Sequence, residues 1–213
     1  MNQNPTTMNK MNYIVRKTED SVLLKSILTG YPAFVVAGVL FSAIMEFRIV
    51  YPFFIILYIL NSLTNKVFKN VIFKPSMGTE ATRRPSGMGG TVGRTDTPYG
   101  CGLFASGKIS KTSVFPSGHS QFAAMAATFW ILYVLRQYRK EGKWRHHGAK
   151  EYICMALKIL PFVVMALLVM TQRVQSRCHS ITQVVVGAAF GIVIGVFGFK
   201  VYQHTMEYKT RKV

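Results

Sequence analysis

The chain has 213 residues, half of them hydrophobic, with 26 Lys and Arg against 8 Asp and Glu and a formal net charge of +18. The mean hydropathy is nevertheless +0.24, and the charges are largely confined to connectors between long apolar runs. This pattern argues against a soluble basic protein and against a soluble helical bundle. It also argues against a nucleic-acid partner, since cations divided between connectors fit anionic lipid better.

Long apolar runs dominate the chain and predict membrane helices. Each is close to the roughly 20 residues that a helix needs to cross a hydrocarbon core of about 30 Å. We therefore expect an all-α, polytopic membrane helical bundle of five or six transmembrane helices. The runs cover residues 27–46, 49–66, 119–137, 153–171 and 181–201.

The runs also suggest the domain organisation. A polar N-terminal segment, 1–26, precedes one predicted membrane domain over 27–203, and a basic tail, 204–213, follows it. Within the domain, the connector 74–116 holds eight of the chain's seventeen glycines. We expect this glycine-rich connector to form a flexible lid over a site rather than a plain linker.

Three clusters of basic residues and histidines lie at the mouths of these runs. Counting spans places all three on one membrane face, because the connector after the second run and the turn between the fourth and fifth lie on the same side. Fixed cations and histidines meeting there suit chemistry on a phosphate. The clusters are Lys69 and Lys74 with Arg83-Arg84-Pro85, then Phe115 to Ser120, and then Arg173, His179 and Gln183.

The third cluster combines a guanidinium with an imidazole. Arg173 can clamp phosphate oxygens with its fork of donors. His179 is the candidate nucleophile, since a neutral imidazole can attack phosphorus and form a phosphohistidine that water hydrolyses, which requires no metal. The plainer alternative is a turn that carries an Arg and a His at the level of the lipid headgroups.

The second cluster predicts an anion site at a helix N-terminus. Ser117 can cap the helix, and Gly118 permits a phosphate to approach the backbone N–H groups closely. His119 can protonate the departing oxygen and then activate water. The alternative is an ordinary N-cap with an incidental histidine.

The first cluster is the loosest of the three. Either Lys69 or Lys74 could bring a point charge to the phosphate, and Arg84 a forked one. Taken alone, this stretch is more typical of a solvated basic loop.

Together the clusters resemble the type 2 phosphatidic-acid phosphatase (PAP2) superfamily of membrane lipid phosphatases, over about residues 65–191. The stretches Phe115–Phe122 (FPSGHSQF) and His179–Val184 (HSITQV) look most like its dolichyl-diphosphatase branch. The resemblance implies that the chain hydrolyses a lipid phosphate or diphosphate without a cofactor. It makes His179 the nucleophile and His119 the acid.

The remaining roles implied by the resemblance concern phosphate binding. Ser117, Gly118 and Arg173 would bind the phosphate, with Lys69 or Lys74 and Arg84 completing the pocket. Its partners would be a membrane lipid bearing a phosphate or diphosphate and the bilayer itself, and the chain could be an isoprenoid, glycerolipid or sphingoid phosphatase.

The sequence departs from the family pattern in three places. Fourteen residues separate Lys69 from Arg84, where the family has about six. Gln172 replaces the serine before Arg173, and Gln183 replaces the aspartate that orients the nucleophilic histidine. An amide can fix the tautomer of His179 but brings no negative charge. A catalytically impaired relative that binds lipid phosphate or scaffolds partners is therefore the alternative to an enzyme.

The basic connectors indicate how the chain is oriented in the membrane. The connector 136–150 packs six Lys and Arg into fifteen residues, which favours the cytosol for that side and a non-cytosolic face for the clusters.

Cys154 lies in an apolar run and is expected to be a packing residue. Cys101 and Cys178 fall on the face of the clusters and could pair if that face is oxidising. No Cys and His spacing suggests zinc, so we expect no metal.

Overall fold

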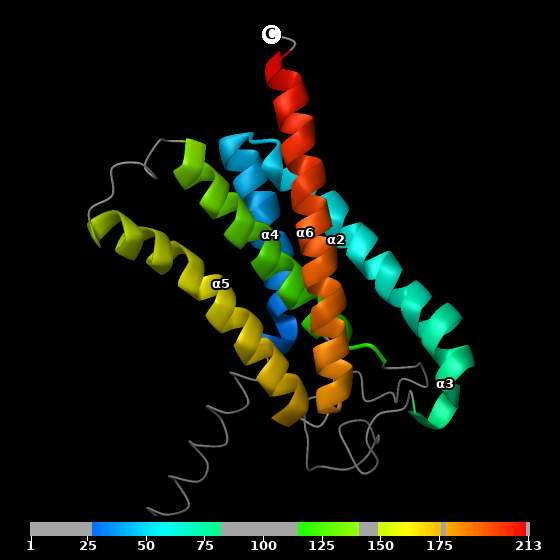
Figure 1. Ribbon diagram of the computed structural model, residues 1–213. Coiled ribbons are helices and arrows are strands. Elements are labelled where there is room, and N and C mark those ends of the chain that lie inside the picture. Colours follow the sequence, from blue (N-terminus) through cyan, green and yellow to red (C-terminus); the bar gives the residue numbers. More distant parts are fainter. Residues whose placement is uncertain (1–26, 82–114, 141–148, 176–177, 212–213) are drawn as a thin grey trace, which may run out of the picture.

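The computed structural model describes residues 27–81, 115–140, 149–175 and 178–211. All regular structure within these ranges is helical, which confirms the all-α class (Figure 1). The first helix, drawn in blue, covers Ile27–Glu46. It is followed by α2 (Val50–Val67), the π-helix η1 (Phe68–Phe73), α3 (Lys74–Ala81), α4 (Gly118–Lys140), α5 (Ala149–Gln175) and α6 (Ile181–Arg211).

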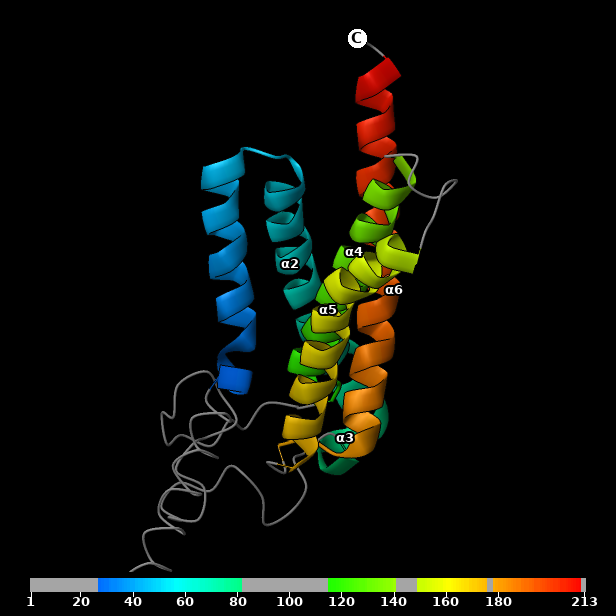
Figure 2. The same cartoon turned by 90° about the vertical axis from the view of Figure 1, so that its left-hand side faces the viewer.

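Helix α4 lies at the centre of the bundle. It packs most extensively against α6, next against α5, and also contacts α2. Figure 2 shows the first helix and α2 side by side on one flank, and α5 and α6 beside α4 on the other. Every residue from Ser120 to Ala127 is buried. The first turns of α4 are therefore covered by the other helices on all sides.

Glycines spaced four residues apart on α6 allow its close packing on α4. Gly187, Gly191 and Gly195 fall on one face of the helix, since positions i and i+4 lie one above the other. A Cβ at Gly195 would lie 2.8 Å from the Met125 carbonyl oxygen, and one at Gly191 would overlap the Gln121 carbonyl oxygen. Small residues let membrane helices approach closely, so the two backbones lie in direct contact.

Four helices of the described residues are long and apolar enough to cross a membrane, which makes this a multi-pass membrane protein. They are Ile27–Glu46, Val50–Gly78, Ala149–Gln175 and Ile181–Tyr208. The expected count of five or six spans is not confirmed, because the run at 119–137 lies in α4, which is not among the four. The reason is physical: the first half of α4 is buried by other helices, so it needs no apolar exterior and carries His119, Ser120 and Gln121 in its first turn.

Several predicted boundaries shift. The second span continues through η1 and into α3, so the connector expected at 74–116 begins as helix over 74–81. Helix α6 runs on to Arg211 and includes most of the expected tail. The glycine-rich stretch at 82–114, where a lid is expected, lies outside the described residues.

An aromatic core holds the helices together. Phe129 of α4 is fully buried, and five other aromatic rings lie with their centroids 5.4 to 6.1 Å from its own. These rings come from α2, α4 and α6. Phe129 lies ten residues along α4 from His119, or about 15 Å. Packing of the helices in this core therefore fixes the polar side chains at one end of the bundle.

Candidate active site

The residues singled out from the sequence converge at the end of the bundle where α4 and α6 begin and α5 ends (Figure 1). Seven of the nine candidates come together there, from four separate stretches of the chain. Lys74 does not, because it is exposed on α3. Arg84 lies outside the described residues. The seven are Lys69, Ser117, Gly118, His119, Arg173, His179 and Gln183.

The turn before α4 is bonded to the start of α6. The Ser117 amide donates to the Gln183 carbonyl oxygen at 3.0 Å. Ser117 is fully buried, and its Oγ accepts from the Ser120 amide at 3.4 Å and from the Ser120 hydroxyl at 3.0 Å. This is the N-cap that the sequence predicts. It leaves the N-terminus of α4 facing the residues that precede α6.

The amide of Gln183 holds the ring of His179 in one orientation. Gln183 Oε1 accepts from the Ser180 amide at 3.2 Å and lies 3.1 Å from His179 Nδ1. Because the backbone N–H requires an acceptor, the oxygen of the side-chain amide must occupy this position. When the ring of His179 is neutral, its proton therefore lies on Nδ1 and its lone pair on Nε2. This is the tautomer that a nucleophile requires.

Arg173 is fully buried, and neutral oxygens orient it. Its Nε donates to Gln172 Oε1 at 2.7 Å, and a terminal nitrogen donates to Thr29 Oγ1 at 2.7 Å. Its own carbonyl accepts from the amides of Cys178 and His179 at 3.0 and 3.2 Å. These bonds place the guanidinium and the imidazole on the same turn. Gln172, which replaces the family's serine, thus helps to fix the arginine.

Thr29 of the first helix is a residue that the sequence analysis missed. It bonds Arg173 through its hydroxyl, and its carbonyl oxygen lies 3.1 Å from His119 Nε2. A carbonyl only accepts, so Nε2 of His119 carries a proton in this contact. Thr29 is buried and lies near the start of the first apolar run. The only feature of the sequence that points to a role for Thr29 is a hydroxyl group within an apolar run, and this is a weak indication.

Lys69, rather than Lys74, lies at the start of α4. A Cβ on Gly118 would be 3.7 Å from Lys69 Nζ and 3.1 Å from Asn65 Oδ1. A side chain at position 118 would therefore be in contact with the ammonium and tight against the Asn65 amide oxygen. An ammonium and the positive end of a helix together favour an anion.

A buried amide ladder behind Lys69 also escaped the sequence analysis. Asn65 Nδ2 donates to Gln121 Oε1 at 2.7 Å, and Gln121 Nε2 donates to Asn61 Oδ1 at 3.0 Å. All three side chains are buried. The ladder joins α2 to α4 and fixes the turn from which Lys69 extends. Its only signal in the sequence is a pair of asparagines four residues apart in an apolar run.

Cysteines and metal ligands complete the description of this end. Cys178 is buried and disulfide-bonded, whereas Cys154 is exposed and free. Cys101, the partner considered from the sequence, lies outside the described residues. Among the residues that the structure describes, no three His, Cys, Asp or Glu side chains are grouped so that they could hold a metal ion.

Comparison with known proteins gives one match. The family model of the PAP2 superfamily matches residues 53–207, well over half of the chain. No curated protein and no solved structure matches the chain. The match covers all the clusters but leaves out the first helix and Thr29. It is to the superfamily as a whole, so the dolichyl-diphosphatase branch stays a prediction.

Proposed function

This chain belongs to the PAP2 superfamily, whose members are generally phosphatases, and we propose that it hydrolyses a phosphate or diphosphate ester of a membrane lipid. The observation that carries the proposal is the pairing of His179 with the oxygen of Gln183 beside the buried Arg173. A site at the end of a membrane bundle would let the lipid tail remain in the bilayer while the headgroup enters.

The proposed reaction has two displacements. His179 Nε2 forms a bond to phosphorus as the bond to the lipid-side oxygen breaks, and protonated His119 gives that oxygen a proton. Water then attacks phosphorus and gives a proton to His119, and the N–P bond breaks to return the electron pair to His179. Positioned cations stabilise charge on the phosphoryl oxygens, a role that Arg173 and Lys69 can fill together with the first amides of α4.

The chemistry of Gln183 bears on whether this chain is an active enzyme or a catalytically silent relative. The amide cannot neutralise the imidazolium that forms on attack, which would make the first step slower than with a carboxylate. The bond from Ser180 favours the enzyme, because it keeps the amide oxygen and not the NH2 group toward His179. We therefore favour a working phosphatase over a protein that only binds lipid phosphate.

The proposal includes a fifth crossing by α4 and a site on the non-cytosolic side. Residues 118 and 136 are separated by about 27 Å of helix, close to the thickness of a hydrocarbon core. Arg136, at the far end from the site, lies 3.8 Å from Glu207 of α6. The basic connector beyond it favours the cytosol, and the bonded Cys178 fits an oxidising compartment on the side of the site.

Phosphate release tests the proposal. Detergent-purified protein is offered a polyprenyl diphosphate and a phosphatidate side by side in EDTA, with His179→Ala as the inactive variant. Gln203→Leu on α6, whose amide bonds Glu207 at 2.9 Å, is the matched control. Release that persists in EDTA and is lost only in His179→Ala supports the metal-free histidine mechanism. No release from either lipid by folded protein would favour the silent relative.

The same panel addresses the branch. Preference for the polyprenyl diphosphate would support the dolichyl-diphosphatase branch. Preference for phosphatidate or a sphingoid phosphate would place the chain with the glycerolipid or sphingoid phosphatases instead.

A further inference from the structure

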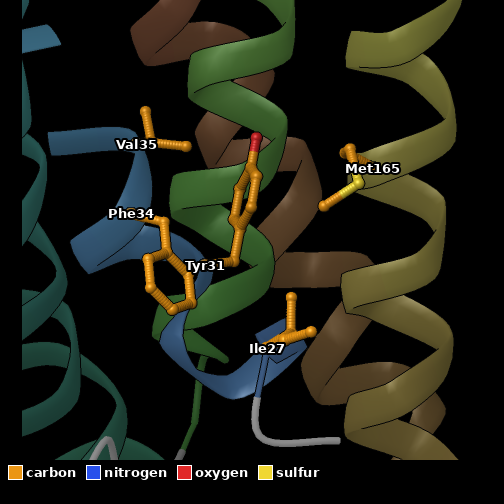
Figure 3. A pocket seen from close by; sticks show the side chains of 5 residues that line it. All are labelled: Ile27, Tyr31, Phe34, Val35 and Met165. Carbon is orange, nitrogen blue, oxygen red and sulfur yellow. The ribbon is translucent and has the colours of Figure 1, made fainter. Parts of the chain in front are cut away.

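An apolar groove lies between the first helix and α5. It has a volume of about 450 Å³ and is lined by Ile27, Tyr31, Phe34, Val35 and Met165 (Figure 3). Four of these side chains come from the first helix, and Met165 faces them from α5. Ile27 is 41% and Phe34 60% exposed, so the groove opens outward from a membrane-spanning segment. Its size falls within the range of about 300–1,000 Å³ for ligand pockets.

A second apolar cavity continues the groove along the first helix. It has a volume of about 260 Å³, and it shares Tyr31 and Val35 with the groove. From there it extends past Gly38 to Ser42, with α4 and α5 supplying the opposite wall through Trp130 and other residues. Residues 27 to 42 span about 22 Å of helix, most of the depth of a hydrocarbon core of about 30 Å.

The groove begins at the candidate active site. Ile27 and Tyr31 line it, and Thr29 lies between them in the sequence. The hydroxyl of Thr29 bonds Arg173, and its carbonyl lies 3.1 Å from His119 Nε2. The same turn of helix therefore borders the polar cluster on one side and the apolar groove on the other. A phosphate at Arg173 would therefore lie next to the turn of helix that lines the groove.

We propose that this groove binds the hydrocarbon chain of the lipid phosphate and that Gly38 leaves it deep enough for a long chain. The inference rests on the proposed function, because it requires the phosphate to lie at Arg173. The occupant follows from the lining: apolar side chains, an opening toward the bilayer and a polar end at the phosphate site fit a lipid tail. A long polyprenyl chain would occupy both cavities, whereas a farnesyl chain would end in the first.

Gly38 is a position where a substitution can change the depth of the groove without disturbing the fold. A Cβ added there would meet no atom within 4 Å, although the residue lines the second cavity. Gly38 is exposed on the rim of the cavity, and leucine is a good helix former, so Gly38→Leu should fold and narrow the cavity. Ala37→Leu is the matched control, since Ala37 is exposed and lines neither cavity.

Binding in an inactive background provides the test. His179→Ala protein is titrated with undecaprenyl and farnesyl diphosphate, and affinity is taken from the rise in Tm. We expect the undecaprenyl lipid to bind more tightly, and Gly38→Leu to weaken it about tenfold or more while leaving the farnesyl lipid unchanged, since buried methylenes supply the difference. Gly38→Ala should lie between, and Ala37→Leu should match the parent. The Tm of each lipid-free variant verifies folding.

Each outcome supports or overturns the inference. Equal weakening of both lipids by Gly38→Leu, or of neither, overturns it, as does an effect of Ala37→Leu as large as that of Gly38→Leu. Hydrolysis of both diphosphates by the wild-type protein is measured in parallel. Hydrolysis without chain-length dependence in binding would reject the groove and keep the phosphatase. Chain-length dependence without hydrolysis would keep the groove and reject the enzyme.

Discussion

Replacing Gln183 with leucine tests whether the amide oxygen sets the tautomer of His179. Gln183 Oε1 is 3.1 Å from His179 Nδ1, and the side chain is buried. Leucine keeps the approximate volume and removes the acceptor. A hydrogen bond to a group that becomes charged contributes about 1.5–3 kcal/mol, which corresponds to a loss of about 10- to 160-fold in kcat. The affinity for phosphate should change little, because Arg173 is held by other residues.

The assay is phosphate release under single-turnover and steady-state conditions, with inorganic phosphate as a competitive inhibitor. Gln203→Leu on the same helix serves as the control and should behave as wild type. Gln183→Glu retains the acceptor with a negative charge and should raise kcat. Leucine also deprives the Ser180 amide of its acceptor, so a modest fall in Tm of both substrate-free and phosphate-bound protein is expected.

Two results would refute this reasoning. A Gln183→Leu enzyme with the wild-type kcat would show that the amide does not orient the ring in the reacting complex. A loss confined to phosphate affinity, with kcat intact, would mean that Gln183 contributes to binding and not to the state of His179.

Three further predictions concern individual side chains. Lys69→Ala should weaken inhibition by phosphate about tenfold, whereas Lys74→Ala should leave it unchanged, and the reverse result would assign the anion site to Lys74. Thr29→Val should lower kcat, because Arg173 loses the hydroxyl oxygen that orients it, while Thr29→Ser restores kcat. Equal effects of the two substitutions would reduce Thr29 to a packing residue. Gly191→Ala should lower the free energy of unfolding by about 1–3 kcal/mol, because the added methyl group overpacks the contact between α6 and α4. Gly38→Ala is the control and should leave stability unchanged. Similar Tm values for the two variants in thermal unfolding would contradict the close approach of α6 to α4.

The sequence predicts much of the candidate site because its motifs are local. Ser117, Gly118 and His119 share one turn, so their capping geometry follows from spacing alone. Span counting then brought Arg173 and His179 to the same end, where the structure also places them. What spacing could not decide was the choice between Lys69 and Lys74. That choice depends on how far α2 extends as helix before the chain turns.

Contacts between segments far apart in the chain could not be predicted from the sequence. Thr29 reaches Arg173 across 144 positions, and Asn65 reaches Gln121 across 56. A polar residue within an apolar run is a weak signal of a buried contact, and it does not identify the partner. The expected count of five or six membrane spans is not confirmed for a different reason. Hydropathy detects helices that face lipid, and α4 is covered by its neighbours.

The residues proposed for catalysis and those proposed for tail binding lie largely in different parts of the chain. The family match begins at residue 53 and takes in both histidines, Arg173 and Lys69, so the proposed chemistry lies within the shared region. The first helix lies outside it, yet it supplies Thr29 to the cluster and most of the groove lining. Changes in this helix could therefore alter the accepted tail without touching the residues that would form and break bonds to phosphorus. In this arrangement the chain-length preference would vary independently of the reaction, and the variants at Gly38 measure that independence directly.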